Sequence, residues 1–89
     1  MKSCQAKNVT ETATVNAHSC NLIGFYVNST TGGTIIIHDT ATTAANAISG
    51  TITPAIGWHF FPASFPTSIH VTVANTIDAT FVYNPVPKS

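Results

Sequence analysis

Apolar residues alternate with mostly polar ones along the last third of the chain, and this period of two is typical of half-buried β-strands. Residues 69–74 and 77–83 both show it, with Ile, Val, Ala, Phe or Tyr at every second position. Asn75-Thr76 lies between the two runs and has the length of a two-residue hairpin loop. The pattern therefore predicts a closing antiparallel hairpin.

A second hairpin is predicted earlier in the chain. Residues 20–28 and 34–39 flank Ser29–Gly33, whose glycines can adopt positive φ. Both faces of residues 20–28 are largely apolar, with Ile23 and Phe25 expected on the same face, which favours a central strand. Weaker strand signals cover residues 10–15, 48–53 and 57–61.

Six to seven short antiparallel strands and no convincing helix indicate an all-β fold, either a small single-domain β-sandwich or a jelly roll. Proline removes a ladder donor, so Pro62 is expected to end the strand before it. Residues 40–47 lack an amphipathic stripe and are expected to form a loop. The domains expected are an N-terminal arm at 1–9, the β-domain at 10–83 and a proline-containing C-terminal tail at 84–89.

Charge is nearly absent: the 89 residues include three Lys, no Arg and three acidic residues. Isolated soluble domains use charge to keep their sheet edges from pairing with other molecules. A domain of this size also has a marginal core, and Cys4 and Cys20 allow at most one disulfide. We therefore expect support from contacts with other subunits. Three Lys near the chain ends cannot form the basic stripe that nucleic acid requires.

Membrane and targeting signals are not expected. Runs such as Ile35-Ile36-Ile37 are far shorter than the ~20 residues of a spanning helix. Residues 1–8 lack the apolar segment of a signal peptide, so synthesis in the cytoplasm is expected, without a membrane partner.

Residues that could carry chemistry are scattered along the chain. His18 and Cys20 form the one close pair of metal-ligand types, and no complete metal spacing occurs, so neither a metal nor a cofactor is expected. His38 and Asp39 are strand neighbours that point to opposite faces, which prevents a base from pairing with its orienting carboxylate. His70 alternates with apolar residues and is expected to be exposed. We therefore expect that the protein is not an enzyme and has no catalytic residues.

Aromatic residues give the interface candidates. Adjacent residues of a strand point to opposite faces, so Phe60 and Phe61 cannot both enter one core. At least one of them is expected to meet a partner or a covering loop, since aromatic side chains are enriched in interface cores. The candidates are Trp58, Phe60, Phe61, Phe65 and Tyr26.

Residues 22–83 resemble small all-β virion proteins of tailed bacteriophages, which include capsid decoration (cement) proteins. The similar segments are Gly24–Asp39, Phe61–Phe65 and the closing pair 69–73 with 79–83. The resemblance carries no catalytic signature. It implies a homotrimer on the capsid exterior that bridges neighbouring major capsid subunits and stabilises the head.

Two further functions are compatible with the sequence. One is a carbohydrate-binding or adhesin-like β-sandwich module that uses Trp58 and Tyr26 as stacking platforms. The other is a virion protein associated with the tail or a fibre. Strand patterning alone does not separate these possibilities from capsid decoration.

Overall fold

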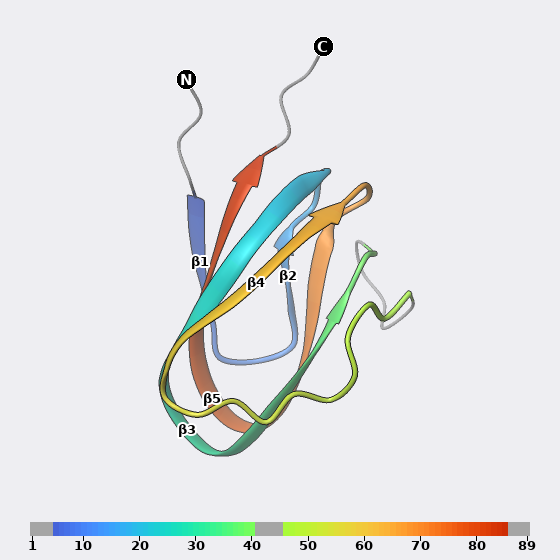
Figure 1. Ribbon diagram of the computed structural model, residues 1–89. Helices are drawn as coiled ribbons and strands as arrows, with labels where there is room; N and C mark the ends of the chain where they lie inside the picture. Colours follow the sequence, from blue (N-terminus) through green and yellow to red (C-terminus); the bar gives the residue numbers. More distant parts are fainter. Residues whose placement is uncertain (1–4, 41–45, 86–89) are drawn as a thin grey trace.

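The computed structural model describes residues 5–40 and 46–85 of the chain (Figure 1). These residues form one antiparallel sheet of five strands, ordered β1-β5-β3-β4, with β2 also paired to β5. The strands are β1 (Gln5–Val9), β2 (Ala13–Asn16), β3 (Cys20–His38), β4 (Gly57–Phe65) and β5 (Ile69–Pro85). The all-β prediction is therefore confirmed. Within the described ranges, no helix is long and apolar enough to cross a membrane.

Two long strands replace the two predicted hairpins. β3 has 19 residues and β5 has 17, and they pair with each other from Cys20 opposite Pro85 to His38 opposite His70. The predicted reversals at Ser29–Gly33 and Asn75-Thr76 are therefore wrong. The chain continues through both segments, so the sheet contains five strands where six to seven were expected.

The turn-forming residues produce a bend instead of a reversal. Gly32 and Asn75 both adopt positive φ, 63° and 62°. A register shift lies at the same place, where Thr31 and Gly32 both face Thr76. The Asn75 Nδ2 donates to the Gly32 carbonyl at 2.9 Å and joins the two bent strands. Positive φ and a β-bulge each sharpen the local twist of a strand.

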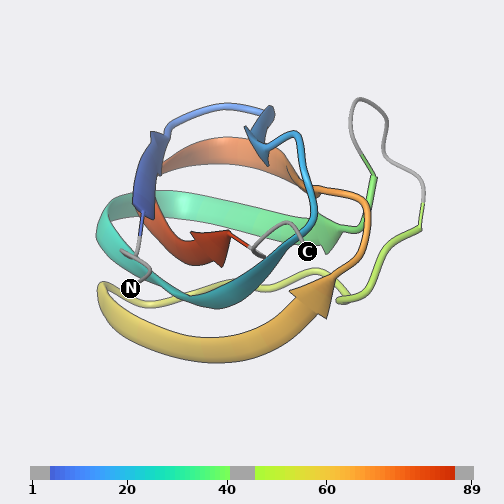
Figure 2. The same ribbon diagram turned by 90° about the horizontal axis from the view of Figure 1, so that it is seen from above.

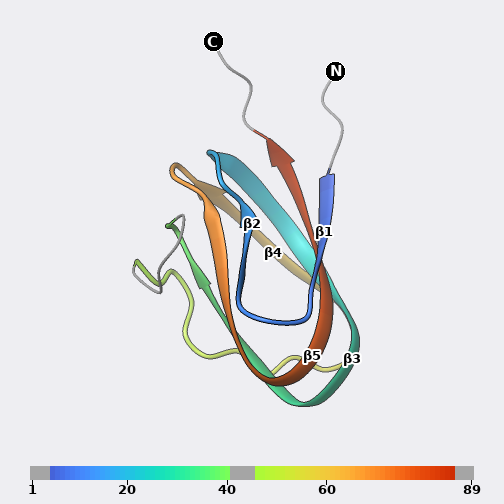
Figure 3. The ribbon, with the colours of Figure 1, turned by 180° about the vertical axis from the view of Figure 1, so that it is seen from behind.

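The bend folds the sheet over, so that its two halves face each other (Figure 2). One half contains β4, β1, the start of β3 and the end of β5. The other contains β2, the end of β3 and the start of β5, along which β2 runs (Figure 3). Phe25 and Phe81 from the first half join Ile37 and Val71 from the second in one buried cluster.

Several predicted boundaries differ from the structure. Residues 5–9, expected in the N-terminal arm, form β1, and residues 84–85, expected in the tail, end β5. Residues 48–53 form no strand, although Ile52 makes an isolated bridge with Ile35. Within the loop expected at 40–47, residues 41–45 lie outside the described residues.

Pro62 does not end β4, which continues to Phe65. The register between β3 and β4 shifts between Leu22 and Gly24, and Pro62 falls in this irregular stretch. Proline is tolerated there because β4 is at the edge of the sheet, where a missing N–H breaks no central ladder.

Candidate interaction surface

β4 forms an open edge of the sheet. It pairs with β3 on one side and has no strand partner on the other among the described residues. Its nine residues, Gly57–Phe65, contain no Lys, Arg, Asp or Glu. Natural sheets protect an edge with charges, prolines or bulges, and β4 uses only the bulge and Pro62. A long uncharged edge of this kind can accept another strand.

The side chains of β4 alternate strictly between the two faces. Trp58 and Phe60 point outward and are 47% and 70% exposed, whereas Phe61 is half-buried and packs against the core. This matches the sequence argument that Phe60 and Phe61 cannot share one core. Phe65, another of the interface candidates, is 1% exposed and belongs to the core cluster, so its side chain packs within the subunit and is not accessible to a partner.

Tyr26 completes a group of three exposed rings on two neighbouring strands. It is 45% exposed and lies directly opposite Trp58 in the register of β3 and β4. Phe60 lies opposite Gly24 in the same register. We call Tyr26, Trp58 and Phe60 the aromatic face.

Gly24 supports the position of the Trp58 ring. A Cβ atom at Gly24 would lie 3.0 Å from Trp58 Cζ2 and 2.3 Å from the His59 carbonyl oxygen. The indole therefore lies over the bare backbone of β3, close enough that a side chain there would displace it. Sequence reasoning missed this role of Gly24, because a glycine within a strand indicates close backbone approach without saying what approaches.

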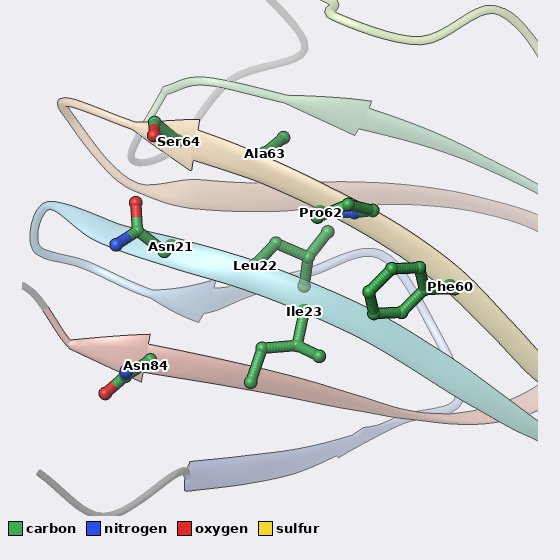
Figure 4. Close-up of a pocket in the computed structure, with 8 residues that line it drawn as sticks. All are labelled: Asn21, Leu22, Ile23, Phe60, Pro62, Ala63, Ser64 and Asn84. Atoms are coloured by element: carbon green, nitrogen blue, oxygen red, sulfur yellow. The ribbon is translucent and has the colours of Figure 1, made fainter.

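A shallow pocket of about 450 Å³ lies beside the aromatic face (Figure 4). Its lining residues are Asn21, Leu22, Ile23, Phe60, Pro62, Ala63, Ser64 and Asn84. Asn21 pairs in register with Ser64 on β4 and with Asn84 on β5, so three small polar residues form a row across three strands. Sequence reasoning did not select this row, because the strands that it joins are distant in sequence.

Ile23, one of the residues that line this pocket, is the extra residue of a bulge in β3. Leu22 faces Tyr83 and Gly24 faces Val82, which leaves Ile23 as the extra residue of β3. Leu22 therefore shares the buried face with Phe25. The predicted grouping of Ile23 with Phe25 is wrong because the bulge shifts the alternation by one residue.

A second set of polar side chains lies at the other end of the aromatic face from the pocket, next to Tyr26, which is in register with Thr80 of β5. Asp78 Oδ1 accepts hydrogen bonds from Asn8 Nδ2 at 2.6 Å and from Asn28 Nδ2 at 3.3 Å. Thr80 Oγ1 lies 3.3 Å from Asn28 Nδ2 and 3.4 Å from Asn8 Nδ2. Asp78 is thus the centre of an amide cluster contributed by β1, β3 and β5.

His38 and His70 form a buried pair in the other half of the sheet. His70 is 6% exposed, so its predicted exposure is wrong: β2 lies alongside it, and Thr14 Oγ1 is 3.2 Å from its Nδ1. His38 Nε2 lies 2.8 Å from Thr72 Oγ1, and the two imidazole centroids are 5.8 Å apart. Burial, and secondarily the neighbouring His38, lower the pKa of His70 below its ordinary value.

Asp39 and Cys20 are the other reactive groups that lie within the body of the subunit. The Asp39 carboxylate accepts hydrogen bonds from the Thr67 and Ser68 backbone amides at 3.0 and 3.3 Å, which fixes the β4–β5 connection. The Cys20 thiol is free and buried, and burial raises its pKa; Cys4 lies outside the described residues. In residues 5–40 and 46–85, no three His, Cys, Asp or Glu side chains gather in a way that could hold a metal ion.

No protein-family model, curated protein or solved structure matches this chain.

Proposed function

We propose that the protein is a structural subunit of a bacteriophage particle, acting as a capsid decoration (cement) protein on the capsid exterior. In this proposal it assembles as a homotrimer and bridges neighbouring subunits of the major capsid protein. The observation that carries the proposal is the uncharged open edge of β4. A subunit that remained alone would leave this edge free to pair at random.

The two edges of one half of the sheet are suited to join copies head to tail. β4 and β1 are the outer strands of the order β1-β5-β3-β4, and each neighbouring pair in that order is antiparallel. β4 and β1 therefore run in opposite directions, so β4 of one copy placed beside β1 of the next continues the antiparallel sheet. Such a heterologous contact forms a ring when its rotation closes, and three copies would satisfy the proposal.

The proposed role matches the low charge and the small core. A subunit that binds the assembled capsid lattice, and not the separate capsid subunits, stabilises the lattice by linkage. Many copies on one head supply avidity without a strong individual contact. The folded-over sheet would act as the compact sandwich-like body from which the edges project.

The test uses a matched pair of variants that each add one Lys at an exposed Ser. Ser64→Lys charges the β4 edge, whereas Ser29→Lys adds the same charge to β3 beyond the end of β4, where β3 is paired with β5 opposite Asp78. We expect the wild type and Ser29→Lys to form trimers by light scattering and to raise the temperature at which decoration-free heads release DNA. Ser64→Lys should weaken trimers at least tenfold, which is about 1.4 kcal/mol. A monomeric wild type that leaves the heads unprotected would refute the proposal.

A further inference from the structure

The solvent-exposed face of β4, β3 and β5, which carries the aromatic face, is not covered by the proposed contact between strand edges. It is therefore available for a ligand. The edge of a strand offers its main chain in the plane of the sheet, whereas its side chains project perpendicular to that plane. We propose that this face binds a neutral oligosaccharide chain, with sugar rings stacked on Trp58 and Phe60 and hydroxyl groups bound by the flanking amides.

The position of Trp58 is the first argument. Its indole lies over the backbone at Gly24 and is still 47% exposed, so it rests on the sheet with surface open to solvent. A supported ring of this kind loses little conformational entropy when a ligand covers it. Phe60 lies two residues further along β4, about 7 Å away, on the same face. Two aromatic surfaces at this spacing can contact successive rings of one chain.

Small polar groups at both ends of the aromatic face are the second argument. Asn21 and Ser64 are exposed beside Phe60 at the pocket. Asn8, Asn28 and Asp78 form the amide cluster at the other end. Amides and a carboxylate supply both donors and acceptors, which a sugar hydroxyl requires because it donates and accepts at once.

The absence of positive charge narrows the ligand class. None of the eight residues that line the pocket is ionisable, and the aromatic face carries no Lys or Arg. Phosphate groups and anionic membrane surfaces need cations for recognition. A neutral ligand with apolar faces and hydroxyl edges has the complementary chemistry.

The size of the aromatic face argues against a large protein partner. Aromatic side chains offer 150–250 Å² each, so three rings that are about half exposed present on the order of 300 Å². One partner of a standard protein interface contributes about 800 Å². Polar rows also interrupt the apolar surface at both ends, where a protein interface would continue.

The experiment titrates the intact protein with neutral hexasaccharides of glucose, mannose and N-acetylglucosamine and follows backbone amides and the Trp58 indole N–H by NMR. We expect at least one series to shift the Trp58 indole and amides of β3 and β4, and to leave the His38–His70 region unchanged. Trp58→Ala should weaken that binding at least tenfold and Phe60→Ala several-fold. Ile48→Ala, which removes another exposed apolar side chain outside this face, should bind as the wild type does.

Three outcomes would overturn the proposal. They are saturating sugar without any shift at Trp58, binding that Trp58→Ala leaves intact, and wild-type binding only to sulfated or phosphorylated sugars. The trimer is measured on the same samples by light scattering. Because Trp58→Ala should keep the trimer and Ser64→Lys should weaken it, failure of sugar binding and failure of assembly are separate results.

Discussion

Phe81 and Phe60 are the same residue type in opposite environments, and this contrast gives a quantitative test of the fold. Phe81 is fully buried and its ring centroid lies 5.1 Å from that of Phe25, while Phe60 is 70% exposed. Truncation of a buried Phe to Ala typically costs about 3–5 kcal/mol through lost burial and the cavity left behind. We therefore expect Phe81→Ala to lower the free energy of unfolding by about 3–5 kcal/mol.

Phe60→Ala should lower the free energy of unfolding by a smaller amount. Only about a third of the side chain is covered, which at about 25 cal/mol per Å² and 150–250 Å² per ring corresponds to about 1–2 kcal/mol. A domain of 89 residues has a total stability of roughly 4–13 kcal/mol. Phe81→Ala should thus bring the subunit close to unfolding, and Phe60→Ala should leave it folded.

The assay is urea unfolding at one fixed protein concentration, followed by far-ultraviolet circular dichroism. With a slope of about 1 kcal/mol per M, the lower end of the usual range for urea, the midpoint should fall by about 3 M or more for Phe81→Ala and by about 1–2 M for Phe60→Ala. Equal shifts, or a larger shift for Phe60→Ala, would show that the faces of the sheet are assigned wrongly.

Three further predictions concern other parts of the molecule. Asn75→Ala should lower the free energy of unfolding by about 1–3 kcal/mol, because it loses the hydrogen bond to Gly32 and places a Cβ-bearing apolar residue at a positive φ. Asn75→Gly should lower it less, since glycine adopts positive φ without strain. A more stable Asn75→Ala than Asn75→Gly would contradict the bend at this position. Gly24→Ala should shift the indole resonance of the β4 tryptophan and destabilise the protein, whereas an unchanged spectrum would exclude the close approach. The pKa of His70 is lowered in the folded protein, so the unfolded chain takes up the proton first as the pH falls. The free energy of unfolding should therefore be highest above the ordinary pKa of 6.5 and should decrease as the pH drops below it. His70→Gln should reduce this decrease in urea midpoints measured from pH 7.5 to 5, and an unchanged pH dependence would show that His70 is not its source.

Alternation could be predicted from the sequence because it is a local property. It gave the all-β class and the opposite directions of Phe60 and Phe61. Turn chemistry was less decisive. Gly32 and Asn75 adopt the positive φ that turn residues allow, but the same φ serves a bend when the two residues face each other across paired strands. That pairing spans more than forty residues of sequence and leaves no local signal.

The candidate surface was partly predictable for the same reason. Trp58 and Tyr26 could be selected as candidate stacking platforms from residue type alone, and both are about half exposed, although the apolar pattern of residues 20–28 favoured a strand covered on both faces. The burial of His70 and the row formed by Asn21, Ser64 and Asn84 depend on which strands become neighbours. The bulge at Ile23 could not be foreseen either, since one inserted residue changes the face of every residue that follows.

Amide hydrogen exchange along β4 tests the central claim, that this edge is covered by another copy, most directly. About half of the β4 amides point away from β3, because successive residues of a strand direct their N–H groups to opposite sides. In the wild-type protein at a concentration where it is assembled, we predict that these amides exchange as slowly as those of β3 and β5, and that they exchange rapidly in Ser64→Lys. Rapid exchange of the same amides in both proteins would contradict the claim.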